Sequence, residues 1–394
     1  MEIRAKLGRL RHTEYFWLCI IVAATLALHI STIADPPELV LDEQHYIPDA
    51  RSIIESRTTL RPEHPPASKL LLVSSMLIFG DNPVGWRAFP VLFGTLNIIL
   101  FYLICRRLHM SQRAANIATF LIGFENLSFV HASVAMLDVF CVTFMLASFW
   151  LYLRKSYSFS AVALALSALA KLPGVFGAGA IGFHWLIINR NKIMAGNRRL
   201  IYDFVSSYLI SPLAFLILMF FMDFLTSGKW ISPAFRINEM MSLMSTLTFS
   251  TAKHDSMSRP WEWLIMPKIM PYWYAPSYMG AISFTLWALI IPSVVYMGYR
   301  MWRGNNAATF GMMWFFFTYL TWIPMSLLTD RISFVFYFYP TIGAVCIGLG
   351  LGMSKLLEVA RNKTNAWRWL IPGTVGTFML AHLVVLGIIS PVFT

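Results

Sequence analysis

The sequence predicts an all-α polytopic membrane protein, and three observations predict it. Hydrophobic residues make up 57% of the 394 residues and charged residues only 13%, a balance that a soluble domain of this size does not need. Apolar runs long enough to cross about 30 Å of hydrocarbon recur along the chain. Basic residues gather in alternate loops, as the positive-inside rule requires. We expect one membrane domain over residues 1–394 with about eleven spans.

The apolar runs set the expected spans in chain order. The first run is longer than a signal-peptide core and is followed by only a loose match to a cleavage site, so we expect a retained helix. The join at Lys171-Leu172-Pro173-Gly174 is either a tight reversal or a kink in one helix, which leaves the number of spans open by about one or two. The expected spans are 15–33, 84–105, 115–125, 138–153, 158–172, 173–189, 204–225, 279–299, 309–328, 333–353 and 369–390.

Charge predicts the orientation of these spans. With the N-terminus inside, the inner stretches hold 19 basic and 4 acidic residues, a net charge of +15, and the remainder holds 12 basic and 15 acidic residues, a net charge of −3. Basic loops stay in the cytoplasm, so we expect a cytoplasmic N-terminus. The overall charge of +12 then reflects the topology and favours contact with anionic membrane lipid. It is only weak evidence that the protein binds nucleic acid.

Two long polar stretches, 34–83 and 226–278, fall on the outer side and are expected to build the functional face, with a shorter outer turn at 125–137. In the first, apolar residues from Tyr46 to Ile54 recur at helical spacing, which predicts a helix lying in the interface. Pro65 begins a second helix that is too short to span. The second stretch is rich in aromatic residues, which form either a belt at the lipid headgroups or a platform for a sugar or lipid.

Ionisable residues beside the bilayer are costly and mark candidate sites. Asp42 and Glu43 precede the first interfacial helix, where they are either a solvated loop pair or an acid pair with a pKa raised toward that of a general base. Asp138 lies at the start of an expected span. It is therefore a helix N-cap, a site residue or both. His64 is either a turn residue before the prolines or a site residue. His131 is either an interfacial histidine or a site residue. The outer cations either extend to the headgroups or bind a phosphate, and they are Lys69, Arg87, Lys171, Arg259 and Arg331.

Six motifs in order resemble one family from about residue 40 to 345. They are Asp42-Glu43, His64-Pro65-Pro66 with Lys69, Met136-Leu137-Asp138, Lys171 to Gly174, Ser258 to Trp263, and Arg331 with Tyr337 to Pro340. Together they resemble the protein O-mannosyltransferases, which have the type C membrane glycosyltransferase fold. The resemblance implies transfer of mannose from dolichyl phosphate to a Ser or Thr hydroxyl, with inversion, on the outer or lumenal face.

The resemblance also assigns roles. It implies that Asp42 is the base, that Glu43 assists, that Asp138 is a second acidic site residue, and that Lys171 and Arg331 contact the donor phosphate. The further substrate-binding candidates are His64, Lys69, Arg87, His131, Arg259, Trp261 and Tyr337. No cofactor is required by the resemblance, although two nearby acids can hold a divalent metal ion. The expected partners are a polyprenyl-phosphate sugar, membrane lipid and an acceptor.

Three departures leave the acceptor open among protein, glycan and lipid. Stretch 226–278 has 53 residues, too few for the lumenal β-trefoil domain of the eukaryotic members. Ser133-Val134-Ala135 stands where the family often has an arginine, and Ala67-Ser68 stands where a bulkier residue and glycine are expected. A secondary transporter is the competing class, but it predicts internal repeats and charges at mid-membrane. The sequence shows no repeat, and its ionisable residues gather toward one face.

Overall fold

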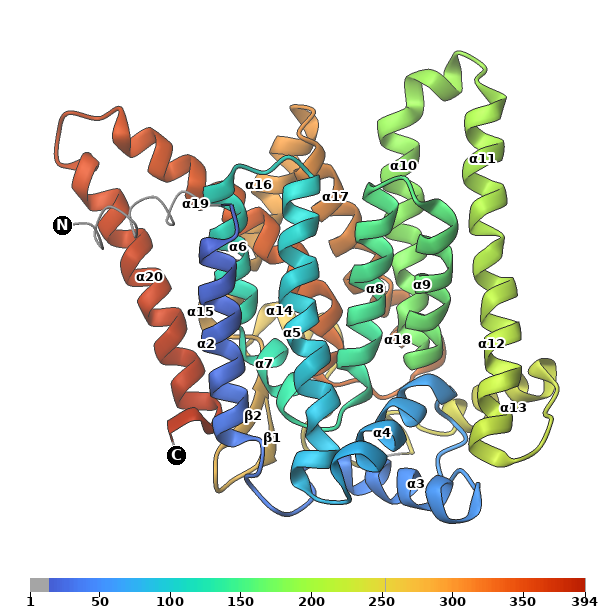
Figure 1. The fold of residues 1–394 in the computed structure, drawn as a ribbon. Helices are drawn as coiled ribbons and strands as arrows, with labels where there is room; N and C mark the ends of the chain where they lie inside the picture. The colour runs from blue at the N-terminus through green and yellow to red at the C-terminus, as the bar shows by residue number, and fades with distance from the viewer. Residues whose placement is uncertain (1–13, 252, 394) are drawn as a thin grey trace, which may run out of the picture.

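The computed structural model describes residues 14–251 and 253–393 as a bundle of helices along a common axis (Figure 1). One end of the bundle carries the short helices α3, α4 and α13 and a β-hairpin, which come from both expected outer stretches. The opposite end carries the loops that are rich in arginine and lysine. Arg4, Lys6, Arg9 and Arg11, which also contribute to the expected inner charge, lie outside the described residues.

The first half of the chain supplies the helices around the outer stretch 34–83. These elements are α2 (Phe16–Thr32), α3 (Glu43–Ser56), α4 (Pro66–Phe79), α5 (Pro83–Arg107), α6 (Gln112–Gly123), α7 (Asn126–Ser133), α8 (Leu137–Leu153), α9 (Tyr157–Ala170), the 3₁₀ turn η1 (Leu172–Val175), α10 (Phe176–Met194), α11 (Arg198–Tyr208) and α12 (Ile210–Ser227).

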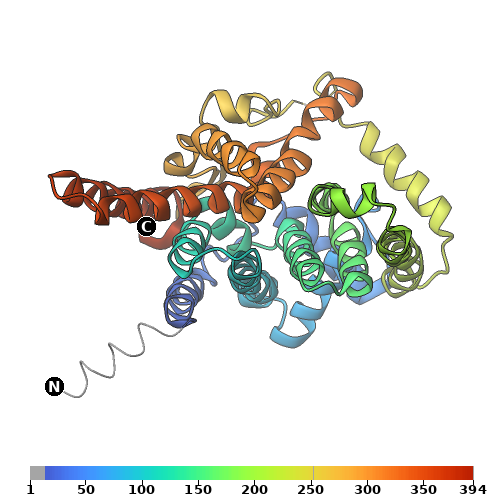
Figure 2. The ribbon, with the colours of Figure 1, turned by 90° about the horizontal axis from the view of Figure 1, so that it is seen from above.

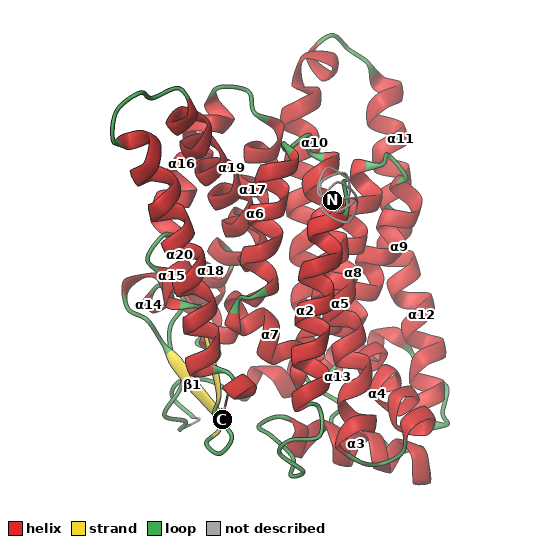
Figure 3. Cartoon of the chain, turned by 60° about the vertical axis from the view of Figure 1, so that its left-hand side comes forward, coloured by secondary structure: helices red, strands yellow, loops and turns green. Residues whose placement is uncertain are grey.

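The second half closes the bundle and adds the hairpin, whose strands are visible in Figure 3. Its elements are α13 (Pro233–Ser245), α14 (Glu262–Ile265), β1 (Ile269–Trp273), β2 (Tyr278–Ala281), α15 (Phe284–Trp287), α16 (Ile290–Trp302), α17 (Asn306–Phe315), the π-helical turn η2 (Phe316–Leu320), α18 (Trp322–Thr329), η3 (Val335–Thr341), α19 (Ile342–Arg361), α20 (Trp367–Ile389) and η4 (Pro391–Phe393).

A polytopic membrane fold is confirmed, whereas eleven spans stay a prediction. Within the described residues, six helical segments are long and apolar enough to cross a membrane. The number rises to seven if α7 and α8, which meet at 115°, form one broken span. Helices α2 and α9 are apolar but shorter than a full span.

Both short helices of the first outer stretch are confirmed. Helix α3 buries Tyr46, Ile47, Ala50 and Ile53 along one face, as their spacing predicts, while Ile54 is exposed. Helix α4 begins at Pro66, where the missing amide proton costs no internal hydrogen bond. The chain thus lies across the end of the bundle twice before α5 enters it (Figure 1).

The join after α9 is a tight reversal. Lys171 is extended, η1 turns the chain, and α10 runs back beside α8 (Figure 1). A Cβ atom on Gly174 would lie 2.3 Å from the Ser167 hydroxyl, so only glycine fits where η1 packs on α9. The reversal places Lys171 at the end of the bundle that carries α3.

Two expectations from the sequence, a loop and the start of a span, were wrong. The expected outer turn at 125–137 is instead the buried helix α7, because the Glu125 carboxylate caps it by accepting the Ser128 amide at 2.8 Å. The expected span 279–299 begins instead with strand β2, which pairs with β1 of stretch 226–278 in an antiparallel hairpin. The Asn126 side chain joins the two features, since it accepts the Ala281 amide at 2.8 Å. One apolar core runs through the bundle and around this junction.

Candidate active site

A cavity of about 1250 Å³ opens between the short helices at the α3 end and the long helices of the bundle. Its polar lining includes Asp42, His64, Lys171, Arg331 and Tyr337, together with Gln44, His45, Arg61, Glu63 and His254, which the sequence analysis did not name. The first five were candidates from the sequence alone. The structure therefore brings together residues that lie up to 295 positions apart in the chain.

The same cavity continues as an apolar arm between α9, α10, α11 and α12. Leu164, Ala168, Ile181, Phe204 and Phe215 are among the residues that line it. Helix α13 closes one side with Ile237, Met240, Met241 and Met244. The site is thus one space with a charged end at the bundle edge and an apolar extension between spans, which suits a ligand with a phosphate and a long hydrocarbon chain.

Asp42 lies directly before α3, and the first turn of that helix fixes its backbone. Its carbonyl oxygen accepts the amides of His45 and Tyr46, each at 2.9 Å, and the Tyr46 hydroxyl donates to its carboxylate at 3.3 Å. Leu41, just before it, has a φ of 43°, a strained left-handed value for a leucine. Burial raises the pKa of Asp42, the Lys171 cation opposes the rise, and the Asp138 carboxylate adds to it.

Lys171 and Asp138 form the second charged group of the site. The Lys171 ammonium lies 2.8 and 2.7 Å from the two carboxylate oxygens of Asp138. It also lies 5.3 Å from the centres of the Phe336 and Tyr337 rings, where a cation is attracted by the ring faces. Asp138 does not line the cavity, so it acts on the cavity through Lys171.

His131 supports this pair from α7. Its Nδ1 atom lies 3.8 Å from the Asp138 carboxylate, and its Nε2 atom is 2.9 Å from the Tyr272 hydroxyl. Tyr272 comes from β1 and lines the cavity, whereas His131 is fully buried behind it. The predicted residue His131 is therefore near the site but one side chain removed from the cavity.

His64 and Arg331 also belong to the polar lining of the cavity. The ring of His64 packs edge-on against Tyr46 with ring centres 5.5 Å apart. Burial, the nearby Lys171 cation and the Lys69 cation lower the pKa of His64 well below its usual value, so the imidazole is neutral. Arg331 lines the cavity, and one of its guanidinium nitrogens donates to the Met244 carbonyl at 2.7 Å.

Glu43 and Arg87 lie outside the cavity as a fully buried pair. The Arg87 guanidinium contacts the Glu43 carboxylate through two bonds of 3.0 and 2.9 Å. Glu43 also accepts the amides of Val40 and Ala135, at 2.9 and 2.8 Å. The pair therefore ties the segment before Asp42 to the bend between α7 and α8, which is a positioning role rather than contact with a ligand.

Three other candidates, Lys69, Arg259 and Trp261, also lie outside the lining of the cavity, and the two cations have local partners. Lys69 lies 3.4 Å from the Asp49 carboxylate and donates to the Thr59 hydroxyl at 2.6 Å. Arg259 pairs with Asp330 at 2.6 Å, and its guanidinium lies 5.9 Å from the Trp261 ring. The sequence alone could not tell these structural cations from Lys171 and Arg331.

Arg236, on α13, is a positioning residue that the sequence analysis missed. It is almost fully buried and lies 3.3 Å from Asp223 of α12 and 2.8 Å from Glu239. It also donates to the carbonyl oxygens of Pro62 and His64, the latter at 3.1 Å. Only Glu239 lies at helical spacing from Arg236, and its other partners are 13 and more than 170 positions away. Arg236 thereby ties α13 to the loop that presents His64.

We expect Arg236→Met to destabilise the protein by about 3–5 kcal/mol, because it leaves the buried Asp223 carboxylate unpaired. Thermal unfolding in detergent micelles measures this change. The double variant Arg236→Met/Asp223→Leu should recover part of the loss, and the exposed Lys229→Met on the same side is the control. Equal stability of Arg236→Met and the control would contradict the role.

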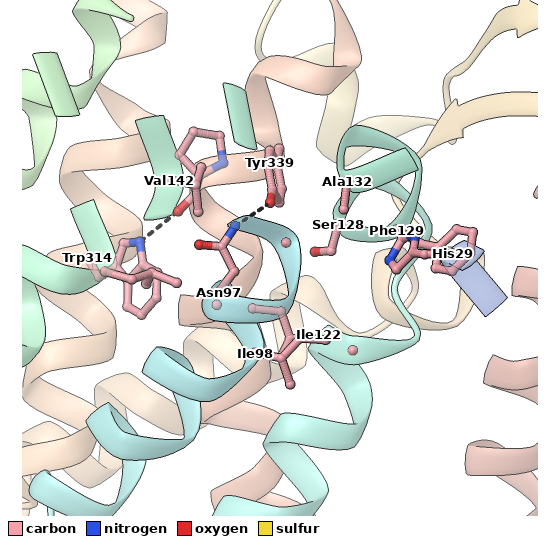
Figure 4. Close-up of a pocket in the computed structure, with 15 residues that line it drawn as sticks. His29, Asn97, Ile98, Ile122, Ser128, Phe129, Ala132, Val142, Trp314 and Tyr339 are labelled. Carbon is pink, nitrogen blue, oxygen red and sulfur yellow. Dashed lines mark hydrogen bonds between the residues drawn. The ribbon is translucent and has the colours of Figure 1, made fainter. Parts of the chain in front are cut away.

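A second cavity, of about 20 Å³, lies inside the bundle among residues that include His29, Asn97 and Tyr339, as Figure 4 shows. Asn97 donates there to the Tyr339 hydroxyl at 3.0 Å, and the Tyr339 ring packs 5.1 Å from the His131 ring. The space is about that of one water molecule and is too small for a sugar. Within the described residues, no group of three or more His, Cys, Asp or Glu side chains is arranged to hold a metal ion.

Residues 70–228 match the model of the family described as dolichyl-phosphate-mannose-protein mannosyltransferase. A polyprenol-phosphate-mannose–protein mannosyltransferase of Corynebacterium glutamicum is 32% identical over 162 residues, which cover 36% of this chain and 30% of that protein. The protein of the same name from Mycobacterium tuberculosis is 30% identical over 138 residues, 34% of this chain and 26% of that one. The matched segments thus span about a third or less of these relatives.

Two solved structures share the fold along nearly the whole chain. One is the Saccharomyces cerevisiae protein O-mannosyltransferase Pmt1-Pmt2 complex bound to the sugar donor, with a TM-score of 0.80, 13% identity and coverage of 98% of this chain and 91% of that one. The other is ArnT from Cupriavidus metallidurans bound to undecaprenyl phosphate, with a TM-score of 0.65, 16% identity and coverage of 96% and 77%. The chain thus has the fold of these two structures, and residues 70–228 resemble the dolichyl-phosphate-mannose-protein mannosyltransferases.

Proposed function

We propose that this protein transfers mannose from a polyprenyl phosphate to a Ser or Thr hydroxyl of a protein, with inversion at the sugar. The observation that carries the proposal is the cavity that joins Asp42 and the cations Lys171 and Arg331 to an apolar arm between spans. The names of the relatives supply mannose and the protein acceptor. A glycan or lipid acceptor is the second candidate, because the 53 residues of stretch 226–278 hold no β-trefoil domain.

The donor fits the cavity with its hydrocarbon chain in the arm and its phosphate at the polar end. Lys171 has three N–H donors, and contact with two Asp138 oxygens leaves at least one for a phosphate oxygen. Arg331 lines the same cavity. These two cations would neutralise the charge that develops on the departing phosphate.

Asp42 is the group placed to accept the proton. As the acceptor oxygen bonds to the anomeric carbon, the bond from that carbon to the phosphate oxygen breaks and the hydroxyl proton passes to the Asp42 carboxylate. Attack from the side opposite the phosphate inverts the sugar. The leaving group is already an anion, so the site needs orientation, a base and positive charge rather than an acid for the leaving oxygen.

The orientation follows from charge. The end of the bundle with Asp42 is opposite the end with the basic loops, so we propose that the N-terminus is cytoplasmic and that the cavity faces the outer or lumenal side. Accessibility of a cysteine introduced at the exposed Glu55, compared with one at the exposed Arg303, tests this with a membrane-impermeant thiol reagent. Labelling of position 303 alone from outside would reverse the assignment.

We propose that transfer needs no divalent metal, because Lys171 already holds both oxygens of Asp138 and supplies positive charge beside Asp42. We therefore expect chelation with EDTA to leave the initial transfer rate within about twofold of the untreated rate. Readdition of Mg²⁺ or Mn²⁺ is the control. A loss of activity that either ion restores would show that the acids hold a metal.

The charges around Asp42 predict how activity depends on pH. Transfer needs the ionised carboxylate, so kcat/KM should fall as pH drops through a pKa above the usual aspartate value of about 3.9. Lys171 lowers this pKa, so Lys171→Met should move the fall to higher pH, whereas Asp138→Asn should move it to lower pH. Shifts of the same sign in the two variants would contradict the assignment of Asp42 as the base.

The direct test uses purified protein, polyprenyl phosphate carrying radiolabelled mannose, and a Ser/Thr-rich peptide. Label in the peptide, stable to acid conditions that cleave the donor phosphate, supports the proposal. Donor binding without peptide labelling, and with label in an added glycan or lipid, would move the acceptor to the second candidate. Absence of donor binding would overturn the proposed function.

A further inference from the structure

A lateral groove of about 630 Å³ lies between α2, α6 and α20, toward the end of the bundle opposite Asp42. Its walls are mainly apolar and include Trp17, Ile21, Ala24, Phe120 and Met379. Helix α20 diverges from α2 toward this end, as Figures 1 and 2 show, so three helix faces surround a wedge that opens to the hydrocarbon region. The groove is separate from the cavity that contains Asp42.

The polar residues of the groove lie at its end, on the first turns of α6. Arg113 makes no hydrogen bond or ion pair with the residues that the structure describes, and its charge acts on the exposed Glu358, which Lys355 already contacts at 2.9 Å. The side-chain oxygen of Asn116 is buried and has no donor among the same residues. The groove thus combines the Arg113 cation, the Asn116 oxygen as a hydrogen-bond acceptor without a donor among the described residues, and an apolar channel next to them.

We propose that the groove binds an anionic glycerophospholipid with a hydroxyl-bearing headgroup. Its phosphate would lie against Arg113, a headgroup hydroxyl would donate to Asn116, and one acyl chain would fill the wedge along Ala24, Phe120 and Met379. Arginine binds phosphate oxygens through a planar pair of donors. Among the described residues, the loops at this end of the bundle hold 15 basic and 3 acidic residues, which adds long-range attraction for an anionic lipid. The proposal is independent of the transferase function.

The test is native mass spectrometry of delipidated protein titrated with palmitoyl-oleoyl phosphatidylglycerol. Phosphatidylcholine of the same chains is the comparison, because it lacks both the net charge and the hydroxyl donors. We expect one phosphatidylglycerol to bind more tightly than phosphatidylcholine. Arg113→Gln should weaken that binding about fivefold, the equivalent of about 1 kcal/mol for one cation at a membrane surface.

Two further variants separate the groove from general attraction to charge. Arg303→Gln removes an exposed cation at the same end of the bundle, outside the groove, and should leave phosphatidylglycerol binding unchanged. Met379→Trp should abolish binding by filling the wedge, and Ala24→Trp is a second filling variant if the first fails to fold. Equal losses in Arg113→Gln and Arg303→Gln, or full binding in a folded filling variant, would overturn the proposal.

Polyprenyl phosphate has the same combination of phosphate and hydrocarbon chain, and a second copy of this protein is another possible occupant. Undecaprenyl phosphate added to the phosphatidylglycerol complex should bind without displacing the lipid, because it enters the other cavity. Displacement, or a dimer that Met379→Trp dissociates, would assign the groove to one of these occupants instead. Mannose transfer by Arg113→Gln should match that of the unchanged protein, so a failure here leaves the proposed function intact.

Discussion

Asp42→Asn is expected to lower mannose transfer by about 10²–10⁴-fold, the usual contribution of a general base. Asparagine has nearly the same volume and can still accept the Tyr46 hydroxyl, which lies 3.3 Å from the carboxylate. The backbone bonds from Asp42 to the first turn of α3 do not involve the side chain. Folding and donor binding should therefore persist while the proton acceptor is lost.

The measurement combines initial transfer rates with donor affinity and thermal unfolding of the same preparation. Glu55→Gln is the matched control, because Glu55 is an exposed acid on the same helix α3 and does not line the cavity. Full activity of Asp42→Asn would remove Asp42 as the base. Loss of donor affinity equal to the loss of rate would instead assign Asp42 to donor binding.

Glu43→Gln is expected to destabilise the protein by about 3–5 kcal/mol, although Glu43 is the immediate neighbour of Asp42. The substitution removes the only full negative charge in contact with the Arg87 guanidinium among the described residues, and both side chains are fully buried. Arginine stays charged in proteins, so the cation cannot be relieved by losing a proton. Activity should fall because the structure loosens.

Unfolding in detergent micelles, followed by heat or denaturant, measures this loss. The double variant Glu43→Leu/Arg87→Leu should be more stable than either single change, since a buried charge pair can be replaced by apolar residues more readily than broken. Glu43→Gln that unfolds like the unchanged protein but transfers no mannose would show that Glu43 acts in the chemistry instead.

Local patterns determined much of the fold. The apolar runs predict helical segments near α5, α10, α12 and α19, and helical spacing and Pro66 predict α3 and α4, because each pattern depends on residues within one helix. The wrong expectations were the outer turn at 125–137 and the start of a span at residue 279. The Glu125 cap of α7 is a local signal that was overlooked. The hairpin instead depends on the contact between Asn126 and Ala281, which lie 155 positions apart and which no local pattern links.

The sequence by itself determined which residues were candidates: it marked Asp42, Lys171 and Arg331 because charge beside lipid is costly. Only the tertiary structure decided which charges face the cavity. It pairs Arg87 with Glu43 and leaves Lys171 between Asp138 and the cavity, although both cations look alike in the sequence. The physical reason is that a buried charge takes the partner that packing brings within about 3–4 Å, and that partner is set by how distant segments meet.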